Sequence, residues 1–324
     1  MTLPDSSDDL RLLDDAVARF ADRHAAPAGL PGPAPDLWPE AVTMGLVGLA
    51  LPSGRGGAGL GARGAFAAGR RLGAQGVPLP FVLGAVFVPA LLDALEETGL
   101  RDTVIAGESR IAVAGDLLHG AAPLAFGPAD ADTVIGVAGE AATILPLAAI
   151  AATGRMADGQ PLYHIAGAAG RQARGLASAR DAALPVTLVA AAAEALGAME
   201  TLFDLTLDHI RLRRQFGRAL GSFQTLQFRM VDLSIALEEA RALAAAAADA
   251  LDAGAAEGAA LAHAAWVQSV WSGRTLAQEA IQLHGAIGMT AECAVSVPVR
   301  RLVILEQLFG GEAAHLARYR ALAA

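Results

Sequence analysis

A cluster of arginine and glutamine residues between two long amphipathic segments constrains the fold more than any other feature of this chain. Apolar residues recur with a period close to 3.6 residues over 190–212 and again over 223–251, which predicts two amphipathic helices. Between them stands Arg213-Arg214-Gln215-Phe216-Gly217, and its glycine marks the break. The chain is therefore expected to turn back on itself here, with two arginines at a helix end.

The residues alone allow two interpretations of these arginines. Cations near a helix C-terminus complement the helix dipole, which stabilises a helix by about 0.3–1 kcal/mol. Alternatively, Arg213 binds a phosphate-bearing ligand through charge-assisted hydrogen bonds, assisted by the side-chain amides of Gln215 and Gln224. Spacing does not decide between capping the helix and binding a phosphate.

Two motifs in this chain resemble those of a known enzyme family. The stretch 213–217, followed by Phe223-Gln224 and then Gln227-Phe228, resembles the flavin-binding signature of the acyl-CoA dehydrogenase family. Residues 282–290, Gln-Leu-His-Gly-Ala-Ile-Gly-Met-Thr, resemble the second signature of that family and follow in the same order. A weaker resemblance over 37–60 covers part of the N-terminal region, whereas the middle of the chain matches poorly.

The resemblance implies a mainly α-helical fold with a small β insert. The expected domains are an N-terminal helical domain at 1–102, a reduced middle β-domain at 103–187 and a C-terminal four-helix bundle at 188–324. Besides the two helices that flank the arginines, the residue pattern predicts helices at 8–25, 38–46, 61–76, 81–95, 258–281 and 299–308. Short β-branched runs at 104–106, 110–113, 133–137 and 142–145 predict strands.

The resemblance also implies FAD as the cofactor. His284 is expected to be a structural residue without a role in proton transfer, and Ala286 departs from the family, which usually has a second glycine there. Contacts with the pyrophosphate and adenine end of a neighbouring subunit's FAD are implied for Arg213, Gln215, Phe216, Leu220, Phe223, Gln224, Gln282 and Gly285.

The implied reaction is the α,β-dehydrogenation of an acyl-CoA thioester, in which a carboxylate removes the α-proton while hydride leaves to the flavin. Gly310 stands where the family's commonest base lies, and Thr187 stands at the position of its alternative base. The remaining candidate, Glu312, is displaced by two residues, about 6–7 Å along an extended chain. The middle region also lacks the Thr-Glu-Pro-Gly and Trp-Ile-Thr motifs with which the family covers the flavin ring.

Three hypotheses are compatible with these departures. The chain is the short, base-less subunit of a heteromeric acyl-CoA dehydrogenase, of the kind used in bacterial steroid and related side-chain degradation. Alternatively, it is a homo-oligomeric dehydrogenase with an atypical base, or a non-catalytic scaffold that retains the fold. Only the first accounts for the missing base and the missing ring motifs together. The implied partners are an acyl-CoA substrate, a homologous subunit or a second copy, and an electron-transferring flavoprotein.

Composition argues against several other classes of protein. A net charge of -9 and a pI near 5.2 disfavour a nucleic-acid partner. The excess in the hydrophobic fraction of 54% is mostly alanine, and no stretch offers about 20 consecutive bulky apolar residues, so no membrane-spanning segment is expected. A single cysteine, Cys293, and seven histidines without metal-ligand spacing predict neither a disulfide nor a metal site. The N-terminal residues do not resemble a signal peptide, so a cytoplasmic protein is expected, and the lack of lysine and asparagine indicates a GC-rich, bacterial source.

Overall fold

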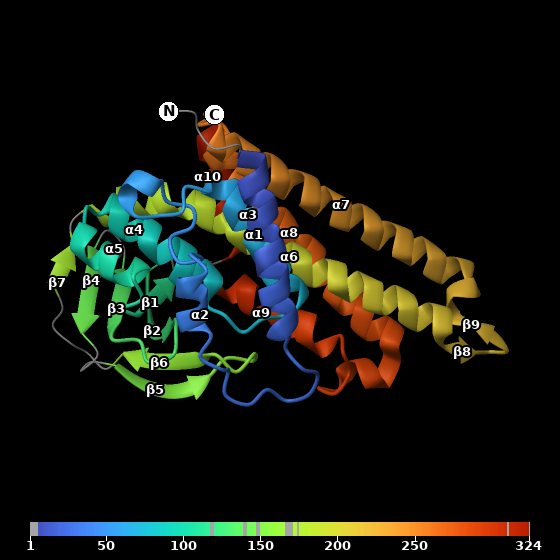
Figure 1. Ribbon diagram of the computed structural model, residues 1–324. Helices are drawn as coiled ribbons and strands as arrows, with labels where there is room; N and C mark the ends of the chain where they lie inside the picture. Colours follow the sequence, from blue (N-terminus) through green and yellow to red (C-terminus); the bar gives the residue numbers. More distant parts are fainter. Residues whose placement is uncertain are drawn as a thin grey trace.

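Helices form most of the molecule, and a sheet lies at one end of it (Figure 1). The computed structural model describes residues 6–116, 120–138, 141–146, 150–165, 171–173, 175–309 and 311–323. The helices before the sheet are α1 (Ser6–Arg23), α2 (Trp38–Thr43), η1 (Ser53–Arg55), α3 (Gly61–Ala74), η2 (Phe81–Phe87), α4 (Val88–Ala94) and α5 (Thr98–Ile105). Those after it are α6 (Leu176–Leu212), η4 (Leu220–Ser222), α7 (Gln224–Asp252), α8 (Gly258–His284), η5 (Gly285–Met289), α9 (Ser296–Leu308) and α10 (Glu312–Ala323).

The long helix α6 forms the centre of the core. It is apolar on nearly all sides, including the alanine run at 190–193, and α3, α7, α8 and α9 pack around it. Its length and composition would allow it to cross a membrane, but 89% of its most apolar 18-residue window is buried within the molecule. A helix that is apolar all round and covered by other helices is the core helix of a globular fold.

Glycines allow α3 and α6 to approach closely. A Cβ atom at Gly73 would lie 1.9 Å from the carbonyl oxygen of Glu194, and one at Gly197 would lie 1.9 Å from that of Arg70. A side chain at either position would push the two backbones apart, which a close-packed core does not tolerate. The two glycines therefore set the distance at which the N-terminal helices rest on the bundle.

The sheet has seven strands in the order β5-β6-β2-β1-β3-β4-β7. The central pair β1 and β3 is parallel, and the other neighbours are antiparallel. Ile111 and Val113 pack into the main core, whereas Ala112 and Ala114 belong to a separate small cluster, as the alternation of a strand requires. The strands are β1 (Ile111–Asp116), β2 (Gly120–Phe126), β3 (Thr133–Ala138), β4 (Ala141–Pro146), β5 (Ile150–Arg155), β6 (Pro161–Ile165) and β7 (Arg171–Ala173).

The sequence predictions hold for the main elements and fail at particular places. The strands expected at 110–113, 133–137 and 142–145 correspond to β1, β3 and β4, and all seven strands lie inside the expected insert. The prediction of a strand at 104–106 is wrong. Val104 and Ile105 are the last residues of α5, and the side chain of Val104 is buried in the helical core. A short apolar run has no period of its own, so it fits a helix as well as a strand. The helix α10 was not predicted, and the division into three domains remains a prediction.

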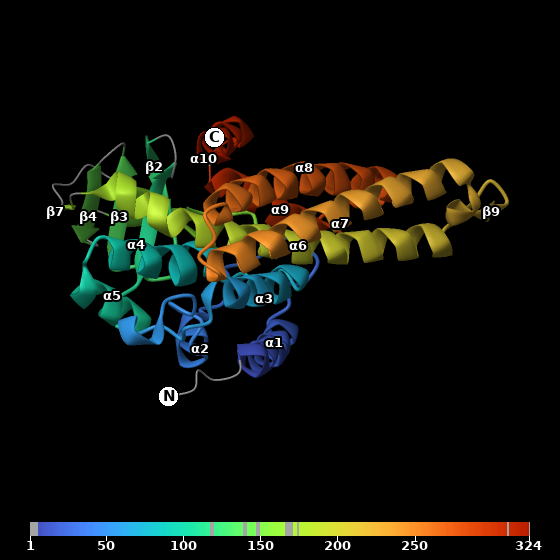
Figure 2. The same ribbon diagram turned by 90° about the horizontal axis from the view of Figure 1, so that it is seen from above.

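In the C-terminal half, α6, α7 and α8 run side by side along the length of the molecule, in alternating directions (Figure 2). The chain leaves the sheet along α6, returns along α7 and goes back along α8. The C-terminus of α6 and the C-terminus of α8 therefore lie at the same end of the bundle, far from the sheet (Figure 1). The two flavin-like motifs are at these two helix ends.

Candidate functional site

The first motif forms a small β-hairpin at the turn from α6 into α7. Strands β8 (Arg214–Gln215) and β9 (Arg218–Ala219) pair in antiparallel fashion. Phe216 and Gly217 form the turn with φ values of +54° and +80°, as a two-residue hairpin turn of type I′ requires. The sequence indicated only a break between helices here; Phe-Gly is not among the usual residue pairs for this turn, so the hairpin was missed.

The arginines of this hairpin lack carboxylate partners. Within the described part of the chain, Arg213, Arg214 and Arg218 form no ion pair, whereas Arg211, two residues before Arg213, pairs with Asp208 at 3.8 Å. The exposed cations therefore leave an uncompensated positive surface at the end of the bundle. Such a surface fits an anionic ligand with several acceptor oxygens.

Aromatic side chains lie beside these cations. The guanidinium of Arg218 lies 3.8 Å from the ring centre of Phe223, and Phe216 meets the same ring edge to face at 6.2 Å. Phe216 is 87% exposed, which is unusual for a large apolar side chain. Together with half-buried Leu220, they form a surface suited to a planar, polarisable group next to an anion.

Two stacked histidines join the second motif to the first. The imidazole rings of His209 in α6 and His284 in α8 lie 4.2 Å apart, tilted by 28°. Beyond His284, Gly285 has φ +69° and is exposed, as are Gln282 and Ala286. The methyl group of Ala286 therefore points into open space at the surface rather than into a packed contact. Gln215 and Gln224 are exposed at the same end of the bundle, so the structure brings all the sequence-predicted cofactor residues to one corner.

The crevice between the sheet and the helices has little free space. It is a cavity of about 20 Å³, lined by Pro80, Phe126, Met156, Gln160 and Leu308 among others. A void of this size holds about one water molecule, whereas ligand pockets of proteins measure about 300–1,000 Å³. A flavin ring does not fit into this crevice as the chain folds.

The loop after β2 is held by hydrogen bonds to the side chain of Tyr163. The Tyr163 hydroxyl donates to the Pro128 carbonyl oxygen at 2.6 Å and accepts from the Ala131 amide at 3.3 Å. A Cβ atom at Gly127 would lie 2.6 Å from the Cα atom of Ala112, so this loop lies directly against β1. Two polar backbone groups of this loop, the Pro128 carbonyl and the Ala131 amide, are therefore bonded within the chain.

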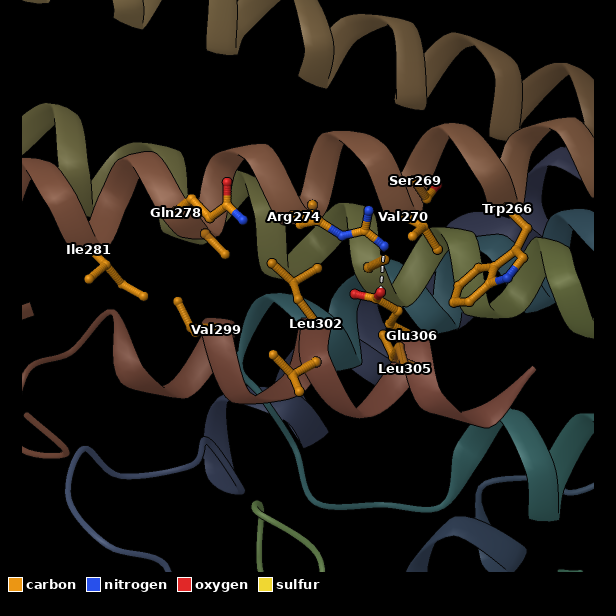
Figure 3. Close-up of a pocket in the computed structure, with 14 residues that line it drawn as sticks. Trp266, Ser269, Val270, Arg274, Gln278, Ile281, Val299, Leu302, Leu305 and Glu306 are labelled. Carbon is orange, nitrogen blue, oxygen red and sulfur yellow. Dashed lines mark hydrogen bonds and ion pairs between the residues drawn. The ribbon is translucent and has the colours of Figure 1, made fainter. Parts of the chain in front are cut away.

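The candidate base Glu312 lies at the start of α10 and faces α8. The indole Nε1 of Trp271 donates to its carboxylate at 2.6 Å, and Arg274 lies 3.7 Å from the same oxygen. Arg274 also donates to Glu306 at 2.6 Å, beside an apolar cavity of about 200 Å³ between α8 and α9 (Figure 3). The carboxylate of Glu312 is thus engaged at the outer surface of α8. Gly310, at the usual base position, lies outside the described residues, and Thr187 is buried with its hydroxyl donated to the Ala183 carbonyl oxygen.

Sequence reasoning missed a buried cluster of charges between α6, α9 and the turn after β5. Arg301 donates to Glu194 at 2.6 Å and to Asp158 at 3.0 Å, and all three side chains are at most 9% exposed. Burial raises the pKa of Glu194 to about 7, against the opposing effect of Arg301 and with a smaller contribution from Asp158. The single glutamate in an alanine run was the available signal, but its partners lie far away in the sequence.

Comparisons with known proteins agree with this architecture. The N-terminal domain model of acyl-CoA dehydrogenase matches residues 7–98, and the C-terminal domain model matches residues 173–319. The acyl-CoA dehydrogenase IpdE2 of Mycolicibacterium smegmatis is 29% identical over 97% of this chain and 99% of that protein. IpdE2 of Mycobacterium tuberculosis is 44% identical over a shorter alignment, which spans 31% of this chain and 30% of that protein.

Solved structures share the whole fold. A chain of the ChsE4-ChsE5 complex from Mycobacterium tuberculosis matches with a TM-score of 0.76 at 21% identity, covering 99% of this chain and 98% of that one. A chain of the Tcur3481-Tcur3483 steroid acyl-CoA dehydrogenase matches with a TM-score of 0.78 at 22% identity, covering 98% of each. The two family models match the helical regions before and after the sheet. This chain therefore belongs to the acyl-CoA dehydrogenase family of flavin oxidoreductases.

Proposed function

We propose that this chain is a subunit of a heteromeric acyl-CoA dehydrogenase that binds the phosphate end of an FAD whose ring is held by a longer partner chain. The observation that carries the proposal is the contrast between two regions of the same molecule. Among the described residues, the three arginines at 213–218 have no carboxylate partner, whereas the void between β2 and α9 has about 20 Å³ of free space. The arginines at 213–218 can therefore bind an anion, whereas the void between β2 and α9 is too small for a flavin ring.

In this proposal the chain's own residues bind and orient. Arg213 and Gln282 would hold the diphosphate, Gly285 would let it approach the backbone, and Phe216 and Phe223 would contact the adenine. The bound FAD supplies the hydride acceptor of the reaction. None of the described residues that line the crevice is a carboxylate, so the base that removes the α-proton is assigned to the partner chain.

The other partners follow from the family. We assign an acyl-CoA thioester as the substrate and an electron-transferring flavoprotein as the electron acceptor, in the cytoplasm, with neither nucleic acid nor membrane as a partner. Two solved relatives are named as pairs of chains, and one of these pairs is called a steroid enzyme. Those names support a steroid side chain as the acyl group and a heteromer as the assembly.

Two alternatives differ from this proposal in what the chain does alone. A homo-oligomer would use Glu312 as its base, which requires that carboxylate to leave Trp271 and Arg274. A non-catalytic scaffold would have no use for the uncompensated cations at 213–218. The contacts of Glu312 and the cations at the corner favour the heteromer over both.

Flavin content separates the three functions. Purified alone, the chain is expected to be colourless, because the void between β2 and α9, about 20 Å³, is too small for the ring. Co-expressed with a neighbouring gene of the same family, it is expected to purify with about one flavin per pair of chains, read from the visible flavin absorbance. About one flavin per subunit in the lone chain would sink the proposal and make Glu312→Gln the next variant to assay. A pair that stays colourless would favour the scaffold.

Arg213→Ala is expected to weaken FAD binding by the complex about 10- to 100-fold, since a hydrogen bond to a charged group contributes about 1.5–3 kcal/mol. The measurement is a fluorescence titration of the flavin-free complex with FAD. Arg211→Ala is the matched control, because Arg211 is exposed on the last turn of α6 and already paired with Asp208. Equal losses in the two variants would show that general positive charge, rather than a contact at Arg213, attracts the cofactor.

A further inference from the structure

The stacked pair of His209 and His284 lies between the two halves of the proposed phosphate corner. His284 is the last residue of α8 and precedes Gly285, and the carbonyl oxygen of His209 accepts from the Arg213 amide at 2.8 Å. The pair is therefore one helical turn from Arg213 on one side and adjacent to Gly285 on the other. An anion held by both motifs is within electrostatic reach of both rings.

The hydrogen bonds of His284 identify the atom that can take up a proton. Its Nδ1 lies 2.8 Å from the carbonyl oxygen of Ala280, and because a carbonyl only accepts, Nδ1 carries a hydrogen. In the neutral ring Nε2 is then free of hydrogen and is the atom that binds an added proton. Two charged imidazolium rings stacked at 4.2 Å would repel each other, so the pair holds at most one extra proton.

Outside the pair itself, the charged side chain that acts on His209 is a cation, Arg213. The pKa of His209 is lowered by burial first, then by His284 and then by Arg213. The other charged groups nearby are already paired: Asp208 with Arg211 on the same helix, and Glu279 of α8 with Arg229 of α7. In the ligand-free chain, the described contacts thus include no negative charge that would stabilise a proton on either ring.

We propose that His209 and His284 are positioning residues that couple nucleotide binding to proton uptake: a diphosphate bound at Arg213 and Gln282 draws one proton from solvent onto the stacked pair. The ligand class is a nucleoside diphosphate, either free or as the ADP part of a dinucleotide. This inference rests on the proposed function, since it needs the corner to bind a diphosphate. The anion supplies the countercharge that the pair lacks, and the protonated pair in turn strengthens the binding of the anion.

The test is calorimetric titration of the full chain with ADP in two buffers that differ in ionisation enthalpy. The difference between the two apparent enthalpies is expected to show net uptake of up to one proton per ADP near pH 7. The affinity for ADP is expected to be about three- to tenfold higher at pH 6 than at pH 8. In His284→Phe, which keeps a stacked ring but removes the Nε2 that takes up the proton, the uptake and the pH dependence are expected to disappear.

A second measurement does not depend on how the variant folds. Nitrogen-15 spectra of the imidazole groups in the wild-type chain are expected to show Nε2 of a histidine moving towards its protonated position when ADP is added. ADP that binds without proton uptake would overturn the coupling and leave the proposed function standing. A wild-type chain, alone and in its complex, that binds no ADP would overturn both.

Discussion

Arg301→Met is expected to destabilise the fold by about 3–5 kcal/mol, the largest loss among the substitutions considered for this chain. Arg301 is 4% exposed and donates to two carboxylates, Glu194 in α6 and Asp158 after β5. Methionine fills much of the same volume but leaves two carboxylates buried without their cation. A cluster that joins α6, α9 and the sheet would then contain uncompensated negative charge, which is far more costly than a lost contact.

Urea unfolding of the wild type and the variant gives the free energy of unfolding directly. Arg300→Met is the matched control, since Arg300 is the preceding residue on α9, half-buried, and its Nη1 donates to Ser296 at 3.1 Å. We expect that control to lose about 1 kcal/mol or less. Adding Glu194→Gln to Arg301→Met should recover part of the loss, because it removes one of the stranded charges. Equal losses for the two arginine variants would refute a special role for the cluster.

Features that depend on residues close together in the sequence could be predicted from it. The period of apolar residues predicted α7, α8 and the part of α6 from residue 190 onward, with the turn at Arg213, because a helix is specified by neighbours three and four residues apart. The first part of α6 was missed: the helix begins at Leu176, inside the region expected to be the β-domain. The two motifs lie at the same end of the bundle because each follows a helix that runs in the same direction. These helices are α6 and α8, and α7 runs back between them. The resemblance then singled out the exposed side chains at that end that are proposed to contact the cofactor.

Contacts between distant residues could not be predicted in this way. Arg301 and Glu194 are 107 positions apart, and no pattern near either residue in the sequence predicts their contact. The stack of His209 on His284 and the engagement of Glu312 by Trp271 are of the same kind. The small crevice beside the sheet is a property of packing, which depends on how several elements meet rather than on any single motif.

A buried pair of histidines is expected to make the free energy of unfolding depend on pH. Nδ1 of His263 in α8 lies 2.9 Å from Nδ1 of His315 in α10, and Nε2 of His315 lies 2.8 Å from the carbonyl oxygen of Phe309. That carbonyl accepts from Nε2–H, so Nδ1 of a neutral His315 is an acceptor and His263 donates. The pKa of His263 is lowered to about 3, chiefly by burial and with smaller contributions from His315 and Arg318.

His263 and Glu194 make stability depend on pH in opposite directions. The unfolded chain protonates His263 below its ordinary pKa of 6.5 while the folded chain does not until about pH 3, so stability from this group falls as the pH drops through that range. Glu194 has its pKa raised from 4.5 to about 7, so the folded chain keeps a proton that the unfolded chain releases. Its contribution is complete below pH 4.5 and is lost as the pH rises to 7. Each group changes the free energy of unfolding by about 2 kcal/mol between pH 7 and pH 5, with opposite signs.

Single variants are therefore expected to reveal a dependence on pH that these two groups cancel in the wild type. His263→Asn keeps an amide donor near the position of Nδ1 but does not titrate, so its free energy of unfolding should rise by about 2 kcal/mol, relative to wild type, from pH 7 to pH 5. Glu194→Gln should fall by a similar amount over the same interval. The measurement is urea unfolding at pH 5, 6 and 7, in which all other titrating groups are common to the three proteins. If both variants followed the wild-type curve, neither buried group would titrate differently on folding. Slopes of opposite sign would show that the two buried groups balance each other between pH 5 and pH 7.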